Sequence, residues 1–304
     1  MRVADRAIVR LLPSVPRSVV QRLSAPYIAG ATLADARASV ARLNAEGKLG
    51  TVDVLGEEVR RPAEAEAVAQ AYHAALDAIA ADHLDANVSV KLTALGLEID
   101  LDLCRPLIAT VVADAAARGI FVRIDMEHSA CTDDTLRIYR ELREAGRDNV
   151  GIVLQSYLRR TLADVGHLAD LRPNVRLCKG IYVEPQSIAF PDRAAIRTSF
   201  VQVLDALLEL GCYVGVATHD EWLIGKTLER VAGLPRDAYE LQMLLGVREE
   251  RGTELVRDGH RLRIYVPYGD RWYEYSLRRL QENPALAGML AKATFSRLLP
   301  GRRS

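Results

Sequence analysis

Short apolar segments rich in β-branched residues recur eight times along this chain of 304 residues. Each is five or six residues long, and each is followed by a longer segment with helical character. In chain order they are TVDVL (51–55), VSVKL (88–92), FVRIDM (121–126), VGIVLQ (150–155), VRLCKG (175–180), YVGVAT (213–218), YELQML (239–244) and LRIYVP (262–267). Segments of this composition are typical of parallel strands that are covered on both faces.

Helical segments separate these strands, and several carry recognisable end signals. Pro62 stands at a helix start, and Gly119 and Gly146 follow helices as C-terminal caps commonly do. Eight β-then-α units predict an α/β fold of the (βα)8 barrel type. A doubly wound open sheet would usually show a G-x-G-x-x-G loop after its first strand, and LGEEVRRP at that place has none.

The expected organisation is one catalytic barrel over residues 49–304, preceded by an N-terminal helical segment over residues 1–48. Within that segment, a packing helix is predicted between Thr32 and Gly47. The chain has 40 Lys and Arg against 40 Asp and Glu, and this balance argues against a general nucleic-acid binder. Its four cysteines show no C-x-x-C spacing, so we expect reduced thiols in a cytoplasmic protein.

Polar side chains gather at the carboxyl ends of the predicted strands, where the active sites of such barrels lie. They are Lys91, Asp125, Glu127, Gln155, Tyr157, Arg176, Lys179, Tyr182, Thr218, His219, Gln242 and Tyr265. Arg176 and Lys179 on one strand are the hardest to explain as structural, because a buried cation needs a carboxylate or phosphate counter-charge. The sequence therefore predicts a barrel mouth that suits a cofactor or substrate with negative charge.

A pair of arginines stands in the last predicted helix, within YSLRRLQEN. Tyr275, Arg278, Arg279 and Glu282 fall at i, i+3, i+4 and i+7, which is one stripe of a helix. Such a pair is usually part of a solvated helix face, and a clamp for a carboxylate at the barrel mouth is the alternative.

Two other functions compete with this interpretation. A metal- or phosphate-dependent barrel lyase or hydrolase could use Asp125, Glu127 and His219, although neither H-x-H nor H-E-x-x-H occurs, so no metal is expected. An inactive binding module could keep the barrel alone. The retained cations Lys91 and Arg176 oppose that possibility, because buried charges are costly.

Taken in order, the motifs resemble those of the proline dehydrogenases. They are VSVKLTALG, RIDMEHS, QSY (155–157), RLCKGIY, ATHD, YELQMLLG, RIYVPYG and YSLRRLQEN, one for each strand from the second onward and one for the final helix. The resemblance runs from TVDVLGE to LRRLQEN and is to the monofunctional bacterial type. It implies a distorted (βα)8 barrel with a final helix over its mouth, noncovalent FAD, and oxidation of L-proline to Δ1-pyrroline-5-carboxylate.

The resemblance also implies roles for individual residues. The residues that would contact FAD are Met126, Gln155, Arg176, Lys179, Gly180, Ile181, Thr218 and His219. The proline carboxylate would be bound by Lys91, Arg278 and Arg279, and Asp125 and Arg176 match positions treated as catalytic. The proline pocket would be walled by Tyr182, Leu244, Tyr265 and Tyr275, with Glu57 paired to Arg278 to close it. Two departures, Cys178 for the common valine and Ile181 for the common alanine, concern the flavin environment rather than the reaction.

Partners follow from the same resemblance. The family passes electrons to a membrane quinone, which implies a peripheral encounter with the inner face of the cell membrane. The terminal segment KATFSRLLPGRRS is basic and amphipathic enough to allow that encounter. No nucleic acid and no stable partner protein are expected.

Overall fold

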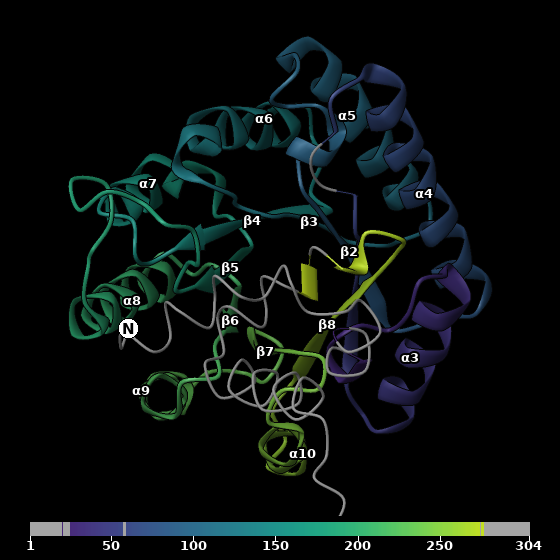
Figure 1. Cartoon of the computed structure of the whole chain (residues 1–304). Helices are drawn as coiled ribbons and strands as arrows, with labels where there is room; N and C mark the ends of the chain where they lie inside the picture. The colour runs from purple at the N-terminus through teal and green to yellow at the C-terminus, as the bar shows by residue number, and fades with distance from the viewer. Residues whose placement is uncertain (1–19, 21–24, 57–58, 274, 277–304) are drawn as a thin grey trace, which may run out of the picture.

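Eight parallel strands close into a barrel in the computed structural model, which describes residues 20, 25–56, 59–273 and 275–276 (Figure 1). The order of the strands around the barrel is their order along the chain. They are β1 Leu49–Val54, β2 Ala86–Val90, β3 Val122–Ile124, β4 Val150–Gln155, β5 Val175–Cys178, β6 Val214–Ala217, β7 Tyr239–Leu244 and β8 Leu262–Tyr268. The predicted (βα)8 barrel is confirmed.

Helices surround the barrel on its outside (Figure 1). They are α3 Leu33–Ala45, α4 Pro62–Ala81, α5 Leu101–Ala117, α6 Thr132–Glu144, α7 Thr161–His167, α8 Arg193–Glu209, α9 Glu221–Val231 and α10 Glu249–Arg257. The predicted packing helix is α3, which begins with a capping box between Thr32 and Asp35 and contacts β1 and β8. The predicted final helix from residue 277 onward lies outside the described residues, and the division at residue 48 stays a prediction.

The core has an apolar layer between the strands and the helices. Side chains at alternate strand positions point outward into this layer, because successive strand residues face opposite sides. Fully or almost fully buried examples are Val88, Val90, Ile152, Leu154, Val214 and Val216, which belong to one cluster with Tyr72, Leu76, Ile108 and Phe200 of the helices. This layer supplies the hydrophobic stabilisation of the fold.

The inside of the barrel is polar instead. Asp53 pairs in register with Ser89, and Ser89 with Arg123. Arg176 pairs with Gly215, and Gly215 with Glu240. Neighbours in register on parallel strands point to the same side, so these buried residues share the barrel interior. Barrels of this type are usually filled with branched apolar side chains, and a polar interior therefore marks the part of the molecule that is built for something besides stability.

Two glycines make space for the long side chains in this interior. A Cβ atom at Gly151 would lie 2.5 Å from Nη1 of Arg123, and one at Gly215 would collide with the Gln242 amide. Arg123 fills its space by donating from Nη1 to the carbonyl oxygens of Ile152 (3.0 Å) and Asn174 (2.6 Å). Glycine is thus needed at these positions because the interior is crowded, not because the backbone is unusual.

Candidate active site

Lys91 lies just beyond the end of β2 and is held between two carboxylates. Its Nζ donates to both carboxylate oxygens of Asp53, at 2.9 and 3.0 Å, and to the Tyr265 hydroxyl at 3.1 Å. Asp125 Oδ2 is 3.7 Å from the same nitrogen. Only 11% of the lysine side chain is exposed. A fixed positive charge stands at the mouth of the barrel.

Asp125 follows β3 and accepts hydrogen bonds on both oxygens. Oδ1 accepts from Ser89 Oγ at 2.6 Å and from Arg176 Nη1 at 2.7 Å. Oδ2 accepts from the Tyr265 hydroxyl at 3.0 Å. Burial, followed by the charge of Asp125, raises the pKa of Tyr265 well above its usual value of 10, so this phenol stays a donor at neutral pH. Asp125 therefore acts as an orienting acceptor for a cation and two hydroxyl groups.

Arg176 on β5 is fixed from three strands. Its Nε donates to Gln242 Oε1 on β7 at 2.6 Å, and its Nη1 also donates to Ser89 Oγ on β2 at 2.9 Å. The guanidinium carbon lies 5.4 Å from the centre of the Tyr265 ring, within the range of a cation–π contact. These contacts cross the barrel and fix the orientation of the Arg176 side chain, which is only 7% exposed.

Gln242 links Arg176 to a second buried ion pair. Its Nε2 donates to Glu240, which also accepts from Arg263 Nε at 2.8 Å and from the Tyr213 hydroxyl at 2.9 Å. Burial alone would raise the pKa of Glu240, but the charge and hydrogen bond of Arg263 outweigh it and lower that pKa. Asp53, Glu240 and Arg263 were not predicted as site residues. The signal for them was a charged residue at an inward position of an apolar strand.

The ends of β4 and β5 supply groups that suit a planar ring with polar edges. Gln155 is buried and donates from Nε2 to the Met126 carbonyl oxygen at 2.8 Å, while its Oε1 has no hydrogen-bond partner among the described residues. Gly180 has φ of +100°, and a Cβ there would collide with the Tyr157 ring. Ile181, next to it, is 50% exposed. The buried Gln155 Oε1 needs a hydrogen-bond donor. A bound cofactor could supply that donor and cover the exposed side chain of Ile181.

Asp220 begins α9 and binds three cations. Its oxygens accept from Lys179 Nζ at 3.3 Å, Arg193 Nη2 at 3.1 Å and Arg197 Nε at 2.9 Å, while the aspartate side chain is 1% exposed. Burial would raise the pKa of Asp220, but the hydrogen bonds of Arg197 and Arg193 and the charge of Lys179 lower it far below its usual range. One carboxylate among three cations leaves an excess of positive charge. Lys179 was predicted here, whereas Arg193 and Arg197 were missed.

His219 and Leu244 are brought together by the ends of β6 and β7. The backbone N–H of Leu244 donates to Nε2 of His219 at 3.0 Å. Because Nε2 is an acceptor, the neutral ring carries its proton on Nδ1. Thr218 is buried beside them, and its Oγ1 accepts from the backbone N–H of Asp220 at 3.1 Å.

Of the other residues predicted to form the proline pocket, the structure describes Tyr182 and Tyr275. Tyr182 is half-buried and packs against the cluster of Tyr157 and Leu158. Tyr275 is buried against Ile28 and Leu55. Glu57, Arg278 and Arg279 lie outside the described residues.

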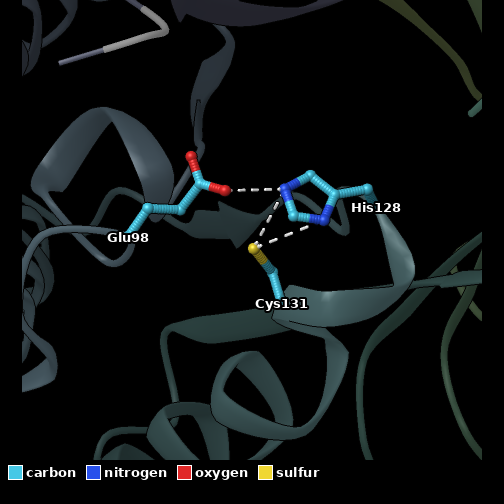
Figure 2. Close-up of side chains that lie close together, drawn as sticks. All are labelled: Glu98, His128 and Cys131. Atoms are coloured by element: carbon cyan, nitrogen blue, oxygen red, sulfur yellow. Dashed lines mark hydrogen bonds and ion pairs between the residues drawn. The ribbon is translucent and has the colours of Figure 1, made fainter.

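The metal-binding alternative is not supported by the geometry. Glu127 accepts from the backbone N–H of Thr93 at 3.1 Å and from its hydroxyl, while Asp125 and His219 are engaged elsewhere. Within the described ranges, the only group of three or more potential ligands that converge is Glu98, His128 and Cys131 (Figure 2).

Known families and proteins give independent evidence. The family model described as proline dehydrogenase matches residues 36–292. This chain belongs to the proline dehydrogenase family. It is 38% identical over 268 residues to proline dehydrogenase 1 of Bacillus subtilis (strain 168), covering 88% of both chains. It is 36% identical over 296 residues to the proline dehydrogenase of Deinococcus radiodurans, covering 95% of this chain and 94% of that one. The predicted monofunctional proline dehydrogenase is thus confirmed, and this family implies a flavin cofactor.

Solved structures confirm the fold of this proline dehydrogenase family member. Proline utilization A (PutA) from Bdellovibrio bacteriovorus, in a crystal structure described as inactivated by N-propargylglycine, superposes with a TM-score of 0.82. The sequence identity is 24%, and the match covers 91% of this chain and 36% of that one. Among the helices that the structure describes, none is long and apolar enough to cross a membrane.

Proposed function

We propose that this protein oxidises L-proline to Δ1-pyrroline-5-carboxylate, with FAD as its resident cofactor and a membrane quinone as the final electron acceptor. The observation that carries the proposal is Lys91, a nearly buried cation held at the barrel mouth by Asp53, Tyr265 and Asp125. L-Proline offers one strongly charged handle away from its reacting carbon, and that handle is its carboxylate. A fixed ammonium group is suited to bind it.

The groups at the ends of β4, β5 and β6 fit FAD. Oε1 of Gln155 is an acceptor for a ring N–H, and the half-exposed side chain of Ile181 offers apolar surface to a planar ring. Lys179, Arg193 and Arg197 supply the positive charge that a diphosphate requires, and Asp220 holds them together. A bound flavin would supply the acceptor for the hydride equivalent that leaves ring carbon C5 of proline.

The protein's own residues orient the substrate and stabilise charge. Lys91 binds the carboxylate, with Arg278 and Arg279 proposed as its partners, so that the pyrrolidine ring is held in one position. Arg176 stabilises the negative charge that develops beside it, because its guanidinium is already oriented by Asp125 and Gln242. Tyr265 and Leu244 exclude water from the reacting carbon.

The substrate amine must lose a proton for the reaction to proceed, since an ammonium group disfavours departure of a hydride. Both oxygens of Asp125 already accept hydrogen bonds. We therefore infer that proline binds as the neutral amine and that Asp125 keeps its role as the acceptor for Arg176 and Tyr265.

A visible spectrum followed by anaerobic addition of L-proline tests this function. The purified protein should be yellow, and L-proline should bleach its flavin band, whereas D-proline at the same concentration should bleach it far more slowly. Bleaching with another cyclic or N-alkyl amino acid but not with L-proline would keep the cofactor and overturn the substrate. A colourless protein that cannot be reconstituted with FAD would overturn the proposal as a whole.

The location that fits this chemistry is the cytoplasm, with a peripheral encounter at the inner face of the membrane. Quinone is soluble in the bilayer, so reduced enzyme has to approach the lipid surface to be reoxidised. Reoxidation by quinone in lipid vesicles should be faster than by a water-soluble quinone at equal concentration. Equal rates would argue against a membrane encounter.

A further inference from the structure

Glu98, His128 and Cys131 form a compact cluster in the loops after β2 and β3. Glu98 follows the short helix η3 (Thr93–Leu95) in the loop after β2. After β3, His128 precedes the short helix η4 (Ser129–Cys131), and Cys131 is the last residue of that helix. His128 Nε2 lies 2.9 Å from Glu98 Oε1 and 3.4 Å from Cys131 Sγ. Figure 2 shows the three side chains pointing toward one another from two loops. Their ligand atoms all lie within 4.8 Å of one another.

The geometry does not suit a nucleophilic cysteine. In a Cys–His–acid relay, the thiol and the carboxylate contact opposite nitrogens of the imidazole ring, so that one nitrogen accepts while the other donates. Here the carboxylate and the thiol both approach Nε2 most closely; Nδ1 is 3.8 Å from the sulfur. Burial, followed by the charges of Glu127 and Glu98, raises the pKa of the Cys131 thiol to about 12. A neutral thiol is a poor nucleophile.

Convergence of three different ligand atoms is the arrangement that a shared cation requires. We propose that Glu98 Oε1, His128 Nε2 and Cys131 Sγ bind one Zn²⁺ ion, with water as the fourth ligand. Tetrahedral zinc with bonds of about 2.0–2.3 Å separates its ligand atoms by about 3.4–3.6 Å. The distances of 2.9 and 3.4 Å reach that geometry with small side-chain movements.

The type of ligand selects the ion. A thiolate and an imidazole favour zinc over magnesium or calcium, which prefer oxygen ligands. Binding would release the thiol proton, because the metal coordinates the thiolate. The thiolate and the Glu98 carboxylate together balance the charge of the ion.

The site would brace the barrel mouth rather than take part in proline oxidation. The His128 ring packs edge-on against Tyr182, with 6.2 Å between ring centres and 79° between planes. Ser129, the next residue, donates from its backbone N–H and its hydroxyl to Glu184 at 2.7 Å each. The ion would therefore join the loops after β2 and β3 and, through these contacts, steady the loop after β5 that carries Tyr182.

Cobalt(II) is a suitable probe, because it replaces zinc and its thiolate complexes absorb in the near ultraviolet. Protein without a polyhistidine tag, with flavin bound, is first treated with a chelator and then titrated with Co²⁺. We expect one ion per chain, a thiolate-to-cobalt band in the difference spectrum, and loss of that band when Zn²⁺ is added. We also expect Zn²⁺ to raise Tm by a few degrees, because it binds the folded state.

Variants locate the site. Cys131→Ser and His128→Ala should remove the band, and Glu98→Gln, at a side chain that is 56% exposed, should weaken Co²⁺ binding at least tenfold. Cys212→Ser, a second buried thiol, and Glu66→Gln, on the exposed face of α4, are controls that should bind as wild type. The proposal is overturned by the absence of stoichiometric binding, by binding without the thiolate band, or by unchanged binding in Glu98→Gln and Cys131→Ser. None of these results depends on oxidation of proline.

Discussion

Gln242 joins Arg176, which is proposed to stabilise developing negative charge, to the buried ion pair of Glu240 and Arg263. Replacing Gln242 with methionine tests that connection. Methionine keeps the unbranched shape and nearly the same volume, so the substitution leaves little cavity. It removes the acceptor for Arg176 Nε at 2.6 Å and the donor to Glu240. Each is a hydrogen bond to a charged group.

Hydrogen bonds to charged groups contribute about 1.5–3 kcal/mol each. Glu240 keeps Arg263 and Tyr213 as donors, and Arg176 keeps Asp125 and Ser89 as acceptors, so the loss is partial on both sides. We expect Gln242→Met to lower the free energy of unfolding by about 3–5 kcal/mol, which is a large share of the total for a typical domain. A displaced guanidinium that loses about 1–2 kcal/mol of charge stabilisation would also lower kcat about 5- to 30-fold.

Urea unfolding followed by circular dichroism measures the first effect, and anaerobic flavin reduction at saturating proline measures the second. Gln202→Met, at an exposed position of α8, is the matched control and should stay within about 0.5 kcal/mol of wild type. A Gln242→Met protein with wild-type stability and wild-type kcat would show that Arg176 does not depend on this support, and the reasoning from the buried network would be refuted.

Three further outcomes follow from the site. Asp220→Asn should lower the free energy of unfolding by about 2 kcal/mol at pH 7. Because the pKa of Asp220 is lowered in the folded state, this difference should begin to shrink as pH falls below about 4, the usual pKa of an aspartate in the unfolded chain, and should be lost only as pH falls through the lowered pKa of the folded state; a constant difference down to about pH 3 would contradict the assignment. Gly180→Ala, at φ of +100° against the Tyr157 ring, should cost about 1–3 kcal/mol and weaken flavin retention, whereas Gly166→Ala, with open space around it, should not. Lastly, kcat/KM should rise with pH toward the amine pKa of proline; a profile that is flat from about pH 6 to 9 would mean that the ammonium form reacts.

The strands and the barrel could be predicted from the sequence, because β-branched segments and helix signals are local. Their ends were less certain: β2 ends at Val90 and β3 at Ile124, so Lys91 and Asp125 stand in the loops just beyond. That position is what brings them together, since all parallel strands end at the same side of the barrel.

The partners of the site residues could not be predicted in the same way. Gln242 is 66 positions from Arg176, and Asp53 is 38 positions from Lys91. Which inward-facing groups meet is decided by strand register and by the space that Gly151 and Gly215 leave, and neither is visible in a local pattern. The cluster of Glu98, His128 and Cys131 joins two loops with no recognisable motif, and was missed for the same reason.

Lys91 is proposed to recognise the carboxylate of proline. The rates of anaerobic flavin reduction by two amines, one with and one without that carboxylate, test this role. Pyrrolidine has the ring and the nitrogen of proline but lacks the carboxylate. The second-order rate constants for L-proline and pyrrolidine are compared in the wild type and in Lys91→Met. We expect the substitution to slow oxidation of L-proline about 30- to 100-fold more than that of pyrrolidine, because one charge-assisted contact is lost. An equal loss with both amines would contradict it, because Lys91 would then serve the ring or the flavin rather than the carboxylate.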